Sequence, residues 1–379
     1  MSFFLLEDPH ACINGIVSRS VAYSFLKMKT SFLSVFAFAL SAAAAPAGAS
    51  FDLVGYGKDN PVGPTTGGDQ KGSKTVTVTT VPEFLAAING SSPTIIYAKG
   101  TFNFTSRPRI GSNKSLIGAG KGAWITGAGL TILNQTNVII RNFGIRGIVG
   151  NDGITIQNSQ RVWIDHNEFT SGNFPAAGFD LYDGQCDIVR ASDWITISWN
   201  YFHDHWKSSL VGNNDQFRDI DFGHLHVTYH HNHWQREGTR GPAGRFGHQH
   251  IYNNLYEDFL YQAIHSRSDN QVLVEANVFT GKTREALSTY GLVIPEDSPN
   301  TGPDGDFEID GFANLGASES HAQPRIRNLL IKNAENDFGK ATVNITQVGN
   351  FTKAPYKFKL TPLKQVSKVV KDGVGLGKI

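Results

Sequence analysis

The chain has 379 residues, of which 40% are hydrophobic and 18% are charged, and its formal net charge is +1. This length suffices for one large domain or two modest ones, and the near-neutral charge gives no reason to expect nucleic acid as a partner. The 40 glycines and the low charge favour a β-rich fold with many tight turns. With only Cys12 and Cys186, a disulfide scaffold is excluded, and we expect Cys186 to be a small buried hydrophobe.

The N-terminal region carries a targeting pattern. From Met28 the sequence has one lysine, an apolar run and then small residues ending in alanine, which is typical of a secretory signal peptide. The apolar run is shorter than the ~20 residues that a membrane span needs. We therefore expect residues 1–27 to be an extension upstream of the true start codon, 28–49 to be a signal peptide, and 50–379 to form a single secreted domain. Several Asn-x-Ser/Thr triplets are compatible with glycosylation.

A repeat runs through the middle of the chain. In each unit, alternating apolar residues end in an asparagine that an aromatic residue follows two positions later. The intervals between units are 33, 32, 22 and 23 residues, and a similar asparagine stands 25 residues before the first. These asparagines are Asn142, Asn167, Asn200, Asn232, Asn254 and Asn277. Period-two alternation predicts strands, and a short period with two longer steps predicts a solenoid with loop insertions.

A parallel β-helix accounts for these features best. No amphipathic helix separates the strands, which argues against βαβ units, and an antiparallel sandwich is the alternative all-β fold. In a β-helix, Ile, Val and Phe would fill the interior and the asparagines would form ladders at the turns. The longer steps contain residues 173–187 and 203–219, which we expect to form long loops on one face, where solenoids often bind their ligands. From about residue 285 we expect a cap and a C-terminal arm.

Three aspartates are candidates for a metal site. Asp183 and Asp187 lie four residues apart in the first inserted loop, and Asp152 begins the strand one rung earlier. Neighbouring rungs are ~4.8 Å apart, so the three carboxylates could converge. Such a site suits calcium, which takes 6–8 oxygen ligands at ~2.3–2.6 Å. The alternative for each aspartate is a turn residue bonded to its own backbone.

Basic and histidine side chains gather in the same region. The arginine fork pairs with carboxylates, which fits a uronate polymer, although each cation could instead be a surface charge. The basic residues are Lys207, Arg236, Arg240, Arg245 and Arg267. Histidines are dense between residues 203 and 250, but their His-x-His spacing does not supply the third and fourth ligands of a zinc site. Stacked, hydrogen-bonded histidines are therefore the favoured interpretation.

Two motifs make the sequence resemble a known family. The segments Trp-Ile-Asp-His (163–166) and Arg-Gly-Pro-Ala-Gly-Arg (240–245), with the aspartates between them, are similar to the fungal-type pectate lyases of polysaccharide lyase family 1. The similarity extends from about residue 51 to the end. It implies a right-handed parallel β-helix and a secreted, monomeric enzyme. It also implies calcium-dependent β-elimination on (1→4)-α-D-galacturonan, the de-esterified form of pectin, to give 4,5-unsaturated oligogalacturonides.

The resemblance also implies roles for individual residues. It gives three Ca²⁺ ligands, namely Asp152, Asp183 and Asp187. Arg240 matches the proposed catalytic base, although an arginine ordinarily keeps its proton up to a pKa above ~12. Lys207 and Arg245 match residues that bind substrate carboxylates, and Arg267 matches a further substrate-contacting arginine. Gly150 stands where some members carry another acidic ligand, which leaves the number of calcium ions open.

Three other functions compete with this interpretation. Pectin lyases act on methylated substrate without calcium and replace the later aspartates by uncharged residues, so Asp183 and Asp187 favour pectate. A polygalacturonase would need paired carboxylates around a water, and the double-aspartate segments of that family are missing. A non-catalytic polysaccharide-binding β-helix would tolerate loss of Arg240, whereas a lyase would not. We thus expect polygalacturonate as the partner, and neither nucleic acid nor a membrane.

Overall fold

The computed structural model describes residues 51–289, 310–315, 325–326, 329–330 and 336–379. The chain divides into two compact units, Met1–Leu40 and Ser41–Ile379, and all described residues belong to the second. The expected extension and signal peptide, residues 1–27 and 28–49, lie outside the described residues. No helix in the described ranges has the length and apolar character needed to cross a membrane.

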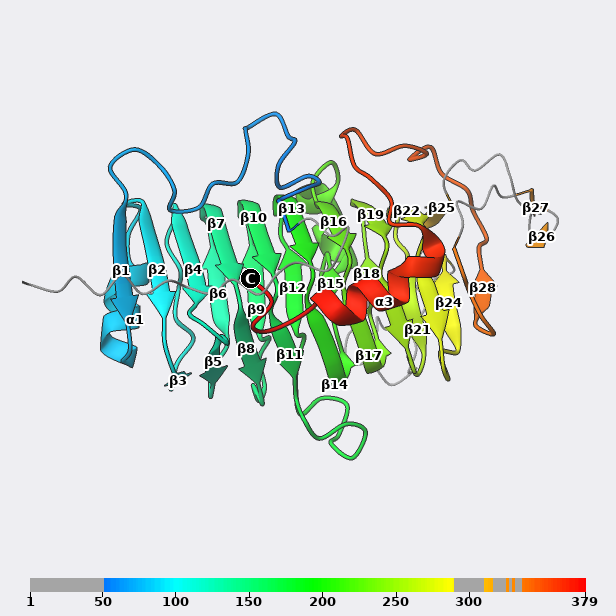
Figure 1. Cartoon of the computed structure of the whole chain (residues 1–379). Coiled ribbons are helices and arrows are strands. Elements are labelled where there is room, and N and C mark those ends of the chain that lie inside the picture. The colour runs from blue at the N-terminus through cyan, green and yellow to red at the C-terminus, as the bar shows by residue number, and fades with distance from the viewer. Residues whose placement is uncertain (1–50, 290–309, 316–324, 327–328, 331–335) are drawn as a thin grey trace, which may run out of the picture. The chain divides into compact units, whose positions relative to one another are not determined.

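The second unit consists mainly of three parallel sheets, and Figure 1 shows their strands side by side, from β1 on the left to β28 on the right. Sheet A has ten strands: β1 (Lys74–Val78), β2 (Thr94–Ala98), β4 (Lys114–Gly118), β7 (Thr136–Arg141), β10 (Gln160–Asp165), β13 (Asp193–Ser198), β16 (His226–His230), β19 (His248–Tyr252), β22 (Gln271–Glu275) and β25 (Phe312–Asn314). Sheet B has eight: β3 (Thr101–Asn103), β5 (Ala123–Thr126), β8 (Phe143–Arg146), β11 (Glu168–Thr170), β14 (Tyr201–Lys207), β17 (His233–Thr239), β20 (Leu255–Glu257) and β23 (Val278–Thr280).

Sheet C also has eight strands: β6 (Leu130–Leu133), β9 (Ile154–Gln157), β12 (Cys186–Val189), β15 (Leu210–Val211), β18 (Ala243–Gly244), β21 (Gln262–Ser266), β24 (Glu285–Ser288) and β28 (Thr342–Asn344). A short antiparallel pair joins β26 (Arg325–Ile326) and β27 (Leu329–Leu330). The helices are α1 (Val81–Ile88), η1 (Asp215–Phe217), α2 (Arg218–Asp221) and α3 (Leu363–Gly373). From β7 to β24 the chain visits sheets A, B and C in turn, so the predicted parallel β-helix is confirmed.

The interior is a column of stacked aliphatic side chains. In sheet A, Val138 pairs with Val162 and Val162 with Ile195 on the next rung, and all three side chains are buried. Parallel in-register pairing places like residues above one another, and burying each Val or Ile contributes about 1.5–3 kcal/mol. Cys186 belongs to the same buried cluster, as predicted.

The predicted asparagine ladder is present inside one turn of the helix. From the second member on, each amide oxygen accepts the main-chain N–H and the side-chain Nδ2–H of the asparagine one rung earlier. The ladder members are Asn167, Asn200, Asn232, Asn254, Asn277 and Asn336. The aromatic residues two positions on stack in the same register, with Phe169 and Phe202 rings 4.7 Å apart. A buried amide column of this kind satisfies the polar atoms of the turns.

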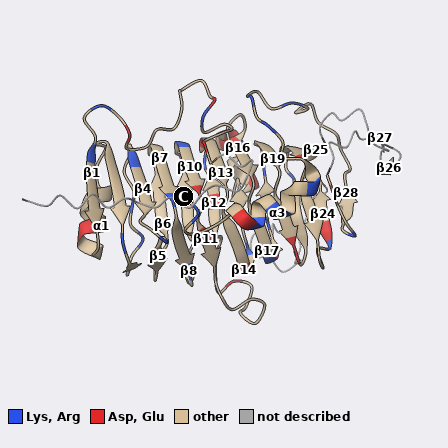
Figure 2. Cartoon of the chain, viewed as in Figure 1, with Lys and Arg blue, Asp and Glu red and all other residues tan. Residues whose placement is uncertain are grey.

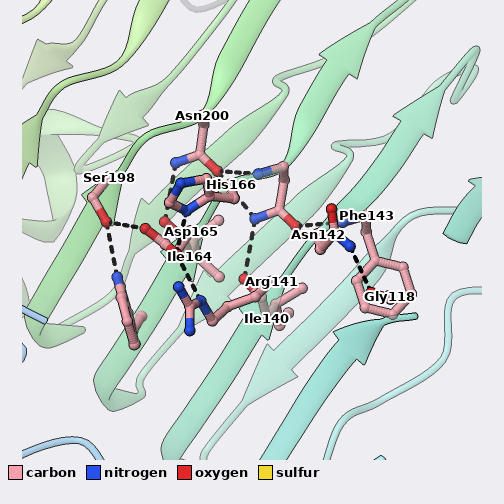
Figure 3. Close-up of polar contacts among 12 residues, drawn as sticks. Gly118, Ile140, Arg141, Asn142, Phe143, Ile164, Asp165, His166, Ser198 and Asn200 are labelled. Carbon is pink, nitrogen blue, oxygen red and sulfur yellow. Dashed lines mark hydrogen bonds and ion pairs between the residues drawn. The ribbon is translucent and has the colours of Figure 1, made fainter. Parts of the chain in front are cut away.

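Asn142, however, is not a member of this ladder. The ladder position on its rung belongs to Phe143, whose main-chain N–H donates to Asn167 Oδ1 at 3.0 Å. Asn142 lies one residue earlier, with φ of 63°, and donates to the carbonyl of Gly118 at 2.6 Å (Figure 3). The true interval is therefore one residue shorter than the sequence pattern indicated.

The two longer steps of the repeat are inserted loops, but the second begins later than predicted. The first occupies residues 171–185, between β11 and β12. In the second step, residues 201–207 form β14 and continue sheet B, and the insertion is 212–225, which contains η1 and α2. The sequence of β14 is polar, which predicted a loop. Several of these polar side chains are buried against the first inserted loop, so the segment forms a strand without an apolar pattern.

The C-terminal part both continues the sheets and forms the predicted arm. β24, β25 and β28 extend sheets A and C, so the prediction that the rungs end near residue 285 was wrong. Beyond them, α3 packs Val366 and Val370 against Trp199 and Leu255, and Figure 1 shows this helix in red lying across the strands. The helix thus covers apolar side chains left on the outside of the rungs.

Histidines on the outer side of sheet A are stacked and hydrogen-bonded, as predicted. The rings of His226 and His248 lie 5.2 Å apart, and that of His230 stacks on Tyr252 at 5.1 Å. His250 Nδ1 lies 2.6 Å from the hydroxyl of Tyr356 in the C-terminal arm. These histidines therefore join the arm to the sheet.

We expect the free energy of unfolding to fall as the pH drops below 6.5. Burial lowers the pKa of His230 from 6.5 to about 3 and that of His248 to about 4. Both stay neutral in the folded chain while the unfolded chain binds a proton at each. The unfolded state therefore gains stability with acid, by up to about 1.4 kcal/mol per pH unit for each histidine. The free energy of unfolding should fall between pH 6.5 and about 4 because of His248, and between pH 6.5 and about 3 because of His230.

Urea unfolding of the wild type and of His230→Phe, each at about pH 7 and about pH 5, measures this slope. The phenyl ring keeps the stack on Tyr252 but binds no proton, so the variant should lose less stability than the wild type. His224→Phe is the control, because the His224 side chain is 47% exposed. Equal losses in His230→Phe and the wild type would contradict the assignment.

Candidate active site

A cleft of about 580 Å³ lies over the strands of sheet C. Five of the seven site residues predicted from the sequence line it, namely Asp152, Asp183, Asp187, Lys207 and Arg240. Charged residues of both signs are scattered along the rungs elsewhere (Figure 2). The cleft is thus the place where the structure brings the predicted carboxylates and cations together.

The helix places these residues on successive rungs. Asp187 on β12 pairs with Thr155 on β9, and Asp152 stands just before β9. On the next two rungs, Lys207 ends β14 opposite Thr239, and Arg240 follows directly. Rungs are about 4.8 Å apart. A chain lying along the helix axis would therefore meet carboxylates first and cations next.

The two buried carboxylates carry charge that the protein itself leaves partly uncompensated. Asp152 accepts the Gly184 N–H at 3.0 Å, and burial followed by the charge of Asp183 raises its pKa. Asp187 accepts the Leu210 N–H at 3.0 Å. Burial, and then the charges of Asp152 and Asp183, raise the pKa of Asp187 well above its usual value, against the opposing charge of Arg240. A bound cation would relieve this repulsion.

The donor set fits calcium in its chemistry. Carboxylate oxygens with excess negative charge in a roomy cleft are what this ion takes. As the side chains stand, no group of three His, Cys, Asp or Glu residues in the described ranges is arranged to hold a metal ion. The half-exposed carboxylate of Asp183 pairs instead with Lys207 Nζ at 3.4 Å.

Lys207 is a carboxylate binder in this structure. Its side chain is 6% exposed, and its ammonium lies 3.2 Å from Asp180 Oδ1 and 3.4 Å from Asp183 Oδ1. The sequence predicted carboxylate contacts for this residue with the substrate rather than with the protein. The structure shows the ammonium bound to two carboxylates of the first inserted loop.

Arg245 and Arg267 do not line the cleft. They follow β18 and β21, whose residues Gly244 and Ser266 pair, so the two arginines sit on adjacent rungs. Both are 2% exposed. Arg245 donates from Nη1 to the carbonyl of Gly212 at 2.7 Å and pairs with Asp215 at 3.5 Å, which ties it to the second inserted loop.

Sequence reasoning missed several lining residues. Arg107 lines the cleft and lies 3.9 Å from Asp152 Oδ2, yet it comes from a segment before the recognised repeats and carries no motif. Asp180 stands in the first inserted loop, three residues before Asp183, and the acidic character of that loop could have identified it. Thr155, which pairs with Asp187 across the rungs, also lines the cleft.

The Trp-Ile-Asp-His motif lies on β10 of sheet A rather than at the cleft. Asp165 is fully buried and accepts from Arg141 Nε at 2.7 Å and Ser198 Oγ at 2.6 Å, and it contacts His166 Nδ1 at 2.5 Å (Figure 3). Burial alone would raise the pKa of Asp165, but the charges of His166 and Arg141 and the hydrogen bonds lower it. This motif therefore stabilises the stacking of the neighbouring strands β7, β10 and β13.

The end of β14 holds the first inserted loop in place through consecutive side chains. His205 Nε2 contacts the carbonyl of Asp183 at 2.6 Å, and Trp206 Nε1 donates to the carbonyl of Ala177 at 2.8 Å. The indole also meets the edges of Phe174 and Phe179. Since this loop carries Asp183, the β14 end sets where that carboxylate lies.

Trp206→Ala should loosen the loop without unfolding the helix. The variant loses the bond to Ala177 and the packing of two phenyl rings, so chymotrypsin should nick the loop about tenfold faster, equivalent to about 1.4 kcal/mol of local opening. Trp124→Ala is a matched control, because Trp124 is also partly exposed and packs against a glycine, Gly144, as Trp206 does against Gly238. Equal rates of cleavage in the two variants would contradict the conclusion that Trp206 holds the first inserted loop in place.

A parallel β-helix whose third sheet carries a cleft of carboxylates and cations is the class of protein defined by these observations. The chain belongs to the pectate lyase family, whose model, described as "Pectate lyase", matches residues 28–291. The enzyme is therefore a pectate lyase.

Relatives of the chain agree with this assignment. "Probable pectate lyase A" of Aspergillus fumigatus is 35% identical over 290 residues, which cover 76% of this chain and 78% of the relative. "Pectate lyase A" of Aspergillus niger is 38% identical over 257 residues, 64% of this chain and 79% of the relative.

Solved structures show the same fold. The pectate lyase Bsp165PelA from Bacillus sp. N165, in complex with trigalacturonate, superposes with a TM-score of 0.63 at 25% identity, covering 86% of this chain and 99% of that one. The thermostable pectate lyase PL 47 gives a TM-score of 0.63 at 25% identity, with coverages of 87% and 97%.

Proposed function

We propose that this pectate lyase is a secreted, calcium-dependent enzyme that cleaves (1→4)-α-D-galacturonan by β-elimination. The main support for this proposal is the cleft of sheet C, in which the buried carboxylates of Asp152 and Asp187 line the same space as Lys207 and Arg240. The trigalacturonate bound to the similar Bacillus enzyme supports polygalacturonate as the substrate class.

Calcium ligation is assigned to Asp152, Asp183 and Asp187. Support comes from the raised pKa of Asp152 and of Asp187, both caused first by burial and then by neighbouring carboxylates. When bound, calcium supplies positive charge that polarises the uronate carboxylate and makes the adjacent C5 proton more acidic.

Arg240 is assigned as the base that takes the C5 proton. The C5–H electron pair then forms the C4=C5 double bond, the C4–O bond breaks, and the departing oxygen takes a proton to become a new reducing end. The negative charge of Asp187 favours the protonated form of Arg240, so neutralising Asp187 makes the guanidinium easier to deprotonate. The nearby ammonium of Lys207 acts in the same direction.

The remaining cations are assigned to substrate carboxylates. Lys207 already binds two carboxylates of the protein, and a uronate carboxylate has the same charge and shape. Arg245, on the rung of Arg240, and Arg267, one rung later, are assigned to the carboxylates of further sugars on the basis of the family resemblance. Residues 28–49 are assigned as the secretory signal peptide, and the enzyme as a monomer.

Mass spectrometry of the products from polygalacturonate tests this function. A lyase gives oligogalacturonides with one unsaturated end, each lighter by one water than the product of a hydrolase. Hydrated products would overturn the proposal in favour of a hydrolase, and no products at all would favour a binding protein. Faster turnover of methylated pectin than of polygalacturonate would move the assignment to pectin lyase.

A further inference from the structure

A second hollow, which we call the neutral groove, lies outside the cleft and has a volume of about 710 Å³. It runs over the turns that lead from sheet C into sheet A, where Asn134 follows β6 and Asn158 follows β9. Gln160 and Trp194, at or near the starts of β10 and β13, continue the lining, and His224 from the second inserted loop borders it.

The charge of this groove differs from that of the cleft. Neither lysine nor arginine is among its lining residues. Its single carboxylate, Asp193, is already hydrogen-bonded: it accepts the His226 N–H at 2.9 Å and lies 2.8 Å from His226 Nδ1 and 3.4 Å from His224 Nδ1. Arg161 is directed to the hydroxyl of Thr136 through two bonds of 3.2 Å. A polyanion therefore finds no lysine or arginine in the lining to pair with, and an uncharged ligand needs none.

The groove offers amide groups that can bind hydroxyls. Asn158 Nδ2 donates to Asn134 Oδ1 at 2.9 Å. Both side chains are exposed, so Asn158 Oδ1 and Asn134 Nδ2 remain to bind a ligand. The half-exposed side chain of Gln160 makes no hydrogen bond within the described ranges. A primary amide presents donors and an acceptor side by side, which matches neighbouring hydroxyl groups of a sugar ring.

An aromatic ring completes the lining. Trp194 is partly exposed and is held by stacking on His226, at 4.5 Å and 13° between planes, and by Tyr56 at 5.9 Å. The ring stack of His248, His226 and Trp194 ends at Trp194 on the side of the neutral groove. A fixed ring with an apolar face beside amides is suited to the carbon-bound hydrogens of a sugar.

The neutral groove adjoins the cleft along two strands. Gln157 lines the cleft and the next residue, Asn158, lines the groove. One rung later Val189 lines the cleft and Ala191, two residues on, lines the groove. One polysaccharide could therefore occupy both hollows at once. Resting on the proposed function, we propose that the neutral groove binds uncharged sugar rings of pectin, next to the acidic stretch held in the cleft.

Two sources could supply such rings, neutral side branches and methyl-esterified galacturonate, and three probes separate them. Calorimetric titrations would use galactotetraose, fully methyl-esterified tetragalacturonate and unesterified tetragalacturonate, all with a calcium chelator to prevent turnover. At least one uncharged probe should bind, and more tightly than the unesterified one. The uncharged probe that binds more tightly identifies the source.

Gln160→Ala should weaken this binding about three- to tenfold, the effect of losing one or two hydrogen bonds. Gln365→Ala, which removes an exposed amide on α3, should leave it unchanged. Trp194→Phe gives a second readout, since the smaller ring keeps the stack on His226 but offers less apolar face. Turnover of trigalacturonate should be the same in Gln160→Ala as in the wild type.

Failure of both uncharged probes to bind would overturn the inference, as would binding that ignores Gln160→Ala and Trp194→Phe. Equal or tighter binding of the unesterified probe would also overturn it. The outcome is separate from that of the proposed function, because it is measured as binding without turnover. Absence of lyase products would refute the proposed function, whereas the titrations would still test whether the neutral groove binds uncharged sugars.

Discussion

Replacing Arg240 by alanine is expected to lower kcat on polygalacturonate by about 10²–10⁴-fold, since the variant loses the group assigned to take the C5 proton. The side chain is 4% exposed and lines the cleft beside Asp187. Calcium binding, followed by calorimetry, should remain close to that of the wild type, because Arg240 is not an assigned ligand. Steady-state kinetics at saturating calcium measures the loss.

Arg236→Ala is the matched control for this experiment. Arg236 lies on β17, four residues before Arg240, and pairs with Asp204 at 2.6 Å, outside the cleft. The Arg236→Ala variant should keep the kcat of the wild type on polygalacturonate. If Arg240→Ala turned over polygalacturonate as fast as Arg236→Ala does, Arg240 would not be the base.

Asp187→Asn should abolish calcium-induced stabilisation while making the metal-free chain more stable. In the wild type, calcium at 100 times its Kd should raise the free energy of unfolding by about 2.7 kcal/mol. The asparagine keeps the acceptor for the Leu210 N–H but removes a buried charge that repels Asp152 and Asp183. Urea unfolding with and without calcium measures both effects.

The control for that variant is Asp59→Asn, which changes an exposed carboxylate far along the chain from the site. It should respond to calcium as the wild type does. Full calcium stabilisation of Asp187→Asn would show that Asp187 does not hold the ion, and the assignment of the whole carboxylate set would then fail.

The fold was predictable from the sequence because a solenoid repeats its packing. Val138, Val162 and Ile195 fill equivalent interior places, so their period is visible in the chain. The same periodicity assigned Asn142 to the asparagine ladder one residue too early, since asparagine occurs at two adjacent positions of the turn. Residues 203–207 of β14 were assigned to a loop, because His205 and Lys207 are buried by contacts with the first inserted loop rather than with the core.

The cleft was predictable only in part. The repeat placed Asp152 and Asp187 on neighbouring rungs, and the motif that begins at Arg240 identified that residue through the family resemblance. Arg107 was missed because its approach to Asp152 depends on how an earlier, irregular segment stacks on the helix. The partners of Lys207 could not be foreseen either, because the path of the inserted loop is set by contacts such as that of Trp206 with Ala177.

The central claim, calcium-dependent β-elimination in this cleft, is tested most directly by the ultraviolet absorbance of unsaturated uronides formed from polygalacturonate. The absorbance should rise with the wild type, stop when calcium is chelated, and resume when calcium is restored. Absorbance that continues unchanged under chelation, or that never appears, would contradict the account.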